Sequence, residues 1–131
     1  MAGRGDWVKH AARDRKFKMK ILERDGACIA CGESDRATLC AHHLITRANL
    51  VVRWDPRNAV TVCNSPRYRR IHGVGESSLP CHELAEVKRA WFESVAIQHL
   101  MDRGLFKSED EAIRFYGAAR SSQPITKNPW S

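Results

Sequence analysis

The chain has 131 residues, of which 43% are hydrophobic and 28% charged, and its formal net charge is +7. These values are typical of one globular domain and exclude an intrinsically disordered chain. There is no apolar run of 18 residues, so no transmembrane helix is expected, and the excess of positive charge favours a polyanionic partner such as a nucleic acid.

The N-terminal segment is the most basic part of the chain. It shows no apolar segment or cleavage site of a secretory signal, so the expected compartment is the cytoplasm, with no membrane partner. Residues 1–24 hold eight Lys or Arg against three Asp or Glu, and F-K-M-K-I-L-E-R at 17–24 is predicted to be a helix that ends at Asp25-Gly26. This arm is either a solvated helix face or a surface that grips DNA phosphates. The candidates for the second role are Lys16, Lys18 and Lys20.

Five cysteines in a cytoplasmic protein favour a metal site over a disulfide framework. The C-x-x-C pair at 28–31 has the spacing with which two thiolates hold one tetrahedral ion, and Gly32 permits the tight turn. The pair alone is also compatible with a thiol redox site, but two cysteines downstream favour zinc. The predicted ligands are Cys28, Cys31, Cys63 and Cys81, which leaves Cys40 as a small buried residue.

Two strands are predicted to follow, A-T-L-C-A-H-H-L-I-T at 37–46 and N-A-V-T-V-C at 58–63, paired as an antiparallel hairpin with a long loop. Because neighbouring side chains of a strand point to opposite faces, His42 and His43 should have different roles, unless both are merely buried and hydrogen-bonded. Asn58 is placed to pin the backbone of the loop. The loop supplies two more candidates for contact with DNA, Arg47 and Arg53.

Residues 64–80 are rich in Pro, Gly and Ser and are predicted to form an irregular loop, basic enough either to be solvated or to contact nucleic acid. Its candidates for contact are Arg67, Arg69 and Arg70. Residues 81–103 have helical spacing, with His82 and Glu86 four positions apart on one face. A last helix is predicted from Ser108 to about residue 120, followed by a loose tail.

Together these elements resemble the HNH endonuclease family, whose core is a ββα-metal fold. The resemblance covers residues 17–90 and depends most on A-H-H at 41–43 and N-A-V-T-V-C at 58–63. It implies an α+β fold with flanking helices and a short β-hairpin. The implied segments are a basic arm at 1–24, a zinc-stapled ββα-metal domain at 25–104 with 64–80 inserted, and a C-terminal helix with a loose tail at 105–131.

The resemblance also implies a role for each candidate residue. His43 matches the general base and Asn58 the residue that ties the loop and orients the base. His42 and His82 match the ligands of a catalytic divalent ion such as Mg²⁺ or Mn²⁺, and Glu86 is placed as a further ligand. The residues that match the structural Zn²⁺ ligands are Cys28, Cys31, Cys63 and Cys81.

The implied activity is hydrolysis of DNA by an endonuclease. Compact members of the family occur in phages and mobile elements, some beside packaging or recombination proteins, in a bacterial or phage-infected cell. The main alternative function is a non-catalytic zinc module that binds nucleic acid through its basic arm. A third is a thiol redox protein that uses Cys28 and Cys31.

The sequence departs from the family pattern in the spacing of the last two cysteines, which are usually two residues apart. Here 17 residues separate Cys63 from Cys81. We expect residues 64–80 to be an insertion that returns Cys81 and His82 to the core, which costs little entropy once both ends are fixed. In the alternative, His72 replaces the missing ligand.

Overall fold

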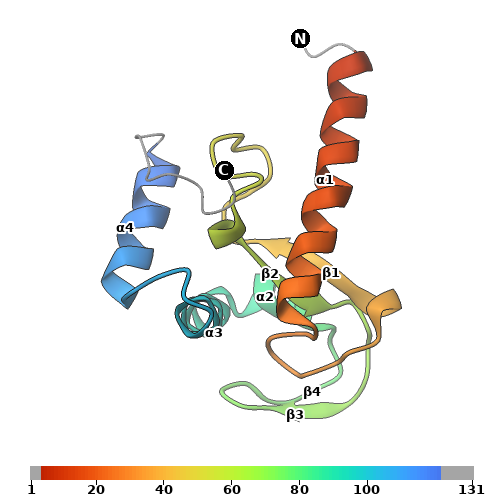
Figure 1. The fold of residues 1–131 in the computed structure, drawn as a ribbon. Helices are drawn as coiled ribbons and strands as arrows, with labels where there is room; N and C mark the ends of the chain where they lie inside the picture. Colours follow the sequence, from red (N-terminus) through yellow and green to blue (C-terminus); the bar gives the residue numbers. More distant parts are fainter. Residues whose placement is uncertain (1–3, 122–131) are drawn as a thin grey trace.

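The computed structural model describes residues 4–121, with side chains from His10 onward. Residues 1–3 and 122–131 lie outside the description, and with them nearly all of the predicted loose tail. In the described part of the chain, no helix combines the length and the apolar character needed to cross a membrane. The fold is α+β, as predicted (Figure 1). Its elements are α1 (Arg4–Asp25), β1 (Leu39–His43), β2 (Ala59–Cys63), β3 (Arg69–Ile71), β4 (Gly75–Ser77), α2 (Cys81–Val87), α3 (Arg89–Asp102) and α4 (Glu109–Arg120).

The strands β1 and β2 form the predicted antiparallel hairpin, and each is preceded by a short 3₁₀ helix. One face of the pair packs against α1, where Ala59 contacts Phe17 and Ile21. On the other face, Val60 and Val62 join the main hydrophobic core with residues of α2, α3 and α4. Neighbouring residues of each strand therefore belong to two different layers. The pairs in register are Leu39–Cys63, Cys40–Val62, Ala41–Thr61, His42–Val60 and His43–Ala59.

The first helix is longer than the sequence indicates and ends where predicted. Gly26 adopts a φ of +74°, a left-handed conformation that glycine takes without strain and that stops the helix. The buried last residue, Asp25, accepts hydrogen bonds from the Thr61 backbone N–H at 2.9 Å, from Arg24 Nε at 2.7 Å and from His99 Nε2 at 2.7 Å. The C-terminal half of α1 is therefore integral to the core, whereas its N-terminal half extends beyond it (Figure 1).

The prediction of an irregular loop over 64–80 is wrong, because β3 and β4 pair as a second antiparallel hairpin. Ile71 is buried in the main core, and Trp91 Nε1 of α3 donates a hydrogen bond to the carbonyl of His72 at 3.1 Å. Gly73, with a φ of +85°, approaches the same indole so closely that a Cβ there would lie 2.6 Å from Nε1. The insertion is thus packed on the main core through Ile71 and Val74 and on α3 through its own backbone, which composition does not reveal.

The single helix predicted over 81–103 is in fact two helices. The chain leaves helical geometry at Lys88, where φ is −113° and ψ is 55°. No Gly or Pro marks this position, and Leu84 and Phe92 on either side are both buried in the main core. We attribute the break to tertiary packing, which overrides local preference. The start of α2 at Cys81, directly after Pro80, agrees with the prediction.

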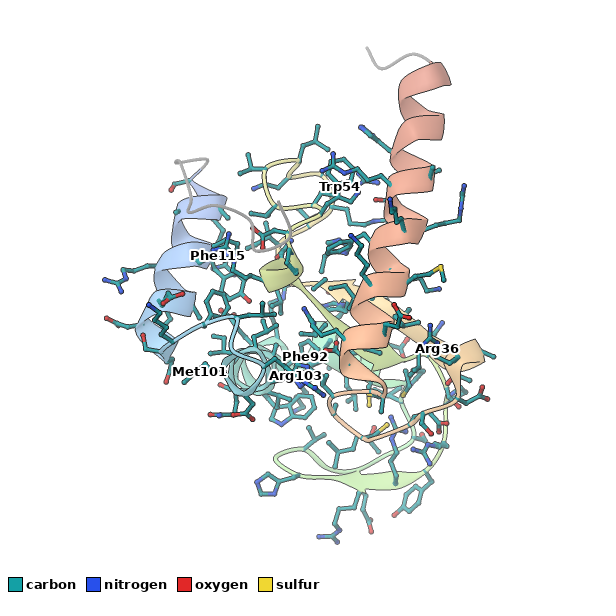
Figure 2. All side chains as sticks on the ribbon, in the orientation of Figure 1. Arg36, Trp54, Phe92, Met101, Arg103 and Phe115 are labelled. Atoms are coloured by element: carbon teal, nitrogen blue, oxygen red, sulfur yellow. The ribbon has the colours of Figure 1, made fainter. Side chains whose placement is uncertain are left out.

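The last helix begins where predicted, because the Ser108 hydroxyl accepts the Glu111 backbone N–H at 3.1 Å. Tyr116 donates from its hydroxyl to the carbonyl of Arg57 at 2.7 Å, and the Arg57 guanidinium lies 4.2 Å from the ring centre of Phe115 (Figure 2). Leu22 of α1 and several residues of α4 belong to one buried cluster. The three predicted segments therefore share a hydrophobic core.

Candidate functional site

The four predicted zinc ligands lie together. Their Sγ atoms are all within 4.8 Å of one another, and those of Cys31 and Cys63 are 3.6 Å apart. A tetrahedral zinc with Zn–S bonds of about 2.3 Å separates its sulfurs by about 3.8 Å, so the group fits such an ion. The first two ligands follow α1, Cys63 ends β2 and Cys81 starts α2. The insertion over 64–80 thus does return Cys81 to the core.

The surroundings favour a thiolate at Cys28, whereas burial raises the pKa of Cys63 and the hydrogen bond with the Cys28 sulfur, together with burial, raises the pKa of Cys81. The thiol of Cys81 and the backbone N–H groups of residues 30 and 31 lower the pKa of Cys28 to about 5. Arg69 Nη2 lies 2.9 Å from the Cys81 sulfur, and Arg67 Nη2 lies 3.6 Å from the Cys31 sulfur. These guanidinium groups offset the negative charge that four thiolates bring to a zinc ion. Two arginines that the sequence offers for contact with DNA, Arg67 and Arg69, therefore lie beside the cysteine cluster.

A separate cleft of about 720 Å³ opens between the end of β1, the loop that follows it and helices α2, α3 and α4. Four predicted site residues line it: His42, His43, His82 and Glu86. Four charged residues that also line the cleft are Arg47, Arg89, Glu93 and Arg120, of which the sequence singled out the first alone. The cleft therefore gathers side chains from four elements around the histidine doublet.

His42 and His82 face each other across the cleft. Their ring centres are 5.4 Å apart with the planes nearly perpendicular, and His42 also packs edge-on against Phe92 at 5.2 Å. Burial, with a smaller effect of the neighbouring His82, lowers the pKa of His42 to about 4. Its imidazole is thus neutral near pH 7, the form that binds metals. Glu86 lies one turn further along α2 and is paired with Arg89 at 3.5 Å.

His43 points to the other side of β1, as strand alternation predicts. Its Nε2 lies 2.8 Å from the carbonyl oxygen of Arg53, and its ring packs 5.7 Å from that of Phe17 on α1. A carbonyl can only accept, so Nε2 carries the proton of the neutral ring and Nδ1 has a free lone pair. Burial lowers the pKa of His43, which keeps the ring neutral near pH 7.

Asn58 is fully buried and makes the contact that the sequence predicts. Its Oδ1 accepts the Ile45 backbone N–H at 2.7 Å, and its Nδ2 donates to the carbonyls of Ile45 at 3.0 Å and Val52 at 3.2 Å. A buried amide with every bond satisfied fixes its neighbours firmly. The loop between β1 and β2 is therefore held at its start and middle, including the segment next to Arg53.

The other sequence candidates have separate places. The lysines Lys16, Lys18 and Lys20 are exposed on α1, and Arg70 is exposed on β3 with Glu76 at 3.7 Å. Arg53 is bound to Asp14, with Nη2 2.6 Å from Oδ2. His72 is exposed in the turn between β3 and β4 and is not among the residues that line the cleft. The structure therefore favours the inserted segment over the replacement by His72.

The missed cleft residues differ in how far the sequence could have signalled them. Arg89 and Glu93 follow His82 and Glu86 at helical spacing and could have been found by extending that face. Arg120 comes from α4, which is close to the cleft only in three dimensions.

No protein-family model matches the chain, and no curated protein or solved structure matches it either. The function of the chain is therefore inferred from the chemistry of the site.

Proposed function

We propose that the chain is a metal-dependent DNA endonuclease of the HNH type that hydrolyses phosphodiester bonds in the cleft. The observation that carries the proposal is the arrangement of three imidazoles along this cleft, those of His42, His43 and His82. His42 and His82 face each other, and His43 is oriented separately by the Arg53 carbonyl.

His43 acts as the general base. With Nε2 donating to the Arg53 carbonyl, Nδ1 accepts a proton from the water that attacks phosphorus. The lowered pKa keeps the ring unprotonated near pH 7, as a base requires. The hydrogen bond to Arg53 grows stronger as the ring gains charge, which stabilises the imidazolium formed by the transfer.

His42 and His82, with Glu86 one helical turn away, would hold a divalent ion such as Mg²⁺ or Mn²⁺. Imidazole and carboxylate are donor types that suit Mn²⁺, and Mg²⁺ in phosphoryl-transfer sites takes few protein ligands. Among the described residues, the donor atoms of these three side chains are not gathered as closely as the four cysteine sulfurs. When bound, such an ion stabilises the negative charge that develops on the leaving oxygen. All three side chains line the cleft.

The charges of the cleft suit a phosphodiester substrate. Arg47 from the loop, Arg89 from α3 and Arg120 from α4 approach it from three directions. Arginine recognises phosphate through paired N–H donors, and such contacts position the backbone without reading sequence. The exposed lysines of α1 extend the positive surface along the helix and would neutralise further phosphates.

The four cysteines take a structural Zn²⁺ in this proposal. All four positions of a tetrahedral ion are filled by thiolates, which leaves none open for a substrate. Its role is to join the segment after α1, the end of β2 and the start of α2. Because α2 also carries His82, the zinc centre and the cleft share one helix.

The test is cleavage of a supercoiled plasmid with Mg²⁺ or Mn²⁺ and with an excess of EDTA. We expect metal-dependent nicking by the wild type and a loss of at least about 100-fold for His43→Ala, within the range expected for a general base. Zinc content and the circular dichroism spectrum serve as controls for folding. Equal cleavage by His43→Ala would overturn the assignment of the base.

The alternative, a non-catalytic zinc module that binds nucleic acid, gives a different result in the same assay. Such a module retards DNA in a gel and cuts none with either metal, and substitution of His43 leaves its affinity unchanged. A thiol redox role predicts instead that Cys28 and Cys31 react rapidly with thiol reagents in the zinc-loaded protein.

A further inference from the structure

The general base depends on a loop carbonyl, and the loop segment that carries this carbonyl is held from α1. The carboxylate of Asp14 accepts three hydrogen bonds: from Arg53 Nε at 3.0 Å, from Arg53 Nη2 at 2.6 Å and from Trp54 Nε1 at 2.9 Å. A bidentate arginine–carboxylate pair fixes orientation as well as distance. Asp14 is therefore in contact with the residue whose carbonyl binds His43.

The rest of the same helix face supports this contact. The Arg13 guanidinium lies 3.9 Å from the ring centre of Trp54, and the His10 ring lies 5.3 Å from it. In Figure 2 the side chain of Trp54 lies beside α1, at the loop between β1 and β2. One turn further along the helix, Phe17 packs on the ring of His43. A single face of α1 thus contacts both the base and the loop segment that orients it.

The loop is tied back on itself at the same point. Arg53 Nη1 donates to the carbonyl of Arg47 at 3.1 Å, and Asn58 Nδ2 donates to the carbonyl of Val52 at 3.2 Å. Asn58 therefore holds the peptide bond between Val52 and Arg53. Asp14 holds the side chain of the same residue through the Arg53 guanidinium. The Arg53 carbonyl therefore lies next to two anchored groups, the Val52 carbonyl and the Arg53 guanidinium.

We propose that Asp14 is a positioning residue for His43, acting through Arg53. The proposal rests on the proposed function and adds to it a role for the N-terminal helix beyond contact with DNA. Asp14 fixes Arg53, the Arg53 carbonyl accepts Nε2–H of His43, and this bond leaves Nδ1 unprotonated and aimed at the water. Loss of the carboxylate releases Arg53 and with it the single tautomer of the base.

The experiment combines turnover with a spectroscopic measurement on zinc-loaded full-length protein. In Asp14→Asn we expect kcat to fall by about 10- to 100-fold with KM little changed, as is usual for residues that orient a catalytic group. The ¹⁵N shifts of the His43 ring, assigned with a His43→Gln variant, should show one tautomer in the wild type and a mixture in Asp14→Asn. Zinc content and unfolding midpoint confirm the fold.

The matched control is Glu23→Gln, which removes the same charge from an exposed position of the same helix. It should leave both readouts as in the wild type, and an equal loss of kcat there would overturn the proposal in favour of a general charge effect. A double variant, Asp14→Asn with Arg53→Gln, should be no worse than Arg53→Gln alone, because both act through one contact. Additive losses would contradict the route through Arg53.

The two proposals fail in different ways. If the wild type cuts no DNA, the proposed function is wrong, and the ring shifts still decide whether Asp14 orients His43. If the wild type cuts DNA and Asp14→Asn keeps both kcat and the single tautomer, the positioning role is wrong and the endonuclease stands.

Discussion

At the scale of single residues, Asp25 shows how one carboxylate can join three elements. It ends α1, accepts the Thr61 N–H from β2 and binds His99 of α3. Burial alone would raise its pKa, but the hydrogen bonds from His99 and Arg24 outweigh this effect and lower the pKa well below the ordinary range. The ionised form of Asp25 is therefore the form that stabilises the fold.

The lowered pKa of Asp25 determines how the free energy of unfolding changes with pH. A carboxyl whose pKa is lowered by folding stabilises the native state above its unfolded pKa of about 4, and the stabilisation is lost as the pH falls below that value. At pH 7 we expect Asp25→Asn to reduce the free energy of unfolding by about 2–4 kcal/mol, because it leaves buried donors unpaired. The difference from the wild type should shrink as the pH falls below about 4.

Urea unfolding between pH 3 and pH 7 measures this difference. Asp102→Asn, an exposed carboxylate on α3, provides the control and should follow the wild type at every pH. A constant difference between Asp25→Asn and the wild type across the range would show that the charge of Asp25 does not stabilise the fold.

For the arginines, residue type alone does not predict which partner each side chain contacts. A basic composition assigns every Arg of the loops to DNA with equal weight. In the structure Arg69 lies on the cysteine sulfurs and Arg53 on Asp14, whereas Arg47 borders the cleft. The cysteine that Arg69 contacts lies 12 residues away and the aspartate that Arg53 contacts lies 39 residues away, and no local pattern specifies either partner. Cys28 and Cys31 were predictable because C-x-x-C spacing is itself the signature of two ligands of one ion, whereas 17 residues separate Cys63 from Cys81 and no local spacing pairs them.

At the scale of elements, the sequence predicted those whose signals are local. The hairpin of β1 and β2, the start of α2 and the cap of α4 all follow from alternation, Pro80 and Ser108. The β3–β4 hairpin and the break at Lys88 were missed, since their causes are the docking of Gly73 on Trp91 and burial on both sides of Lys88. Elements defined by packing with distant residues leave no periodic signature in so short a segment.

The position of α4 leads to a prediction about DNA binding. Its C-terminal end is tied to the loop by Asn49 Nδ2, which donates to the carbonyl of Ala119 at 2.8 Å, and this places Arg120 at the cleft. If Arg120 neutralises a phosphate, Arg120→Ala should weaken duplex binding and reduce the slope of log Kd against log salt by about one.

Fluorescence anisotropy with a His43→Ala background measures binding without cleavage. The control is Arg114→Ala, an exposed arginine of the same helix that is not among the described residues lining the cleft. It should change affinity and slope little. Equal effects of the two variants would mean that α4 contributes only general positive charge and that Arg120 has no special contact.

At the scale of the whole molecule, the cysteine cluster and the cleft depend on the same frame. The segment after α1 supplies two ligands, β2 the third and α2 the fourth, and α2 also carries His82 into the cleft. A chain of this size buries a modest core, so a metal bound by these four cysteines would contribute a large share of its stability. Loss of the ion should therefore affect the whole fold and not the cysteine turn alone.

We expect Cys81→Ser to lower the zinc content from one ion per chain, with a loss of unfolding free energy on the order of several kcal/mol. Cys40→Ser is the matched control, because Cys40 is half-buried on β1 outside the cluster and its sulfur contacts the Val62 carbonyl at 3.6 Å. Elemental analysis and thermal unfolding of both variants provide the measurement. Since α2 links the two sites, Cys81→Ser should also disturb the ring signals of His82, while Cys40→Ser should leave them in place. Full zinc occupancy and an unchanged unfolding midpoint in Cys81→Ser would show that the inserted segment returns Cys81 to the cluster without giving it a role as a ligand.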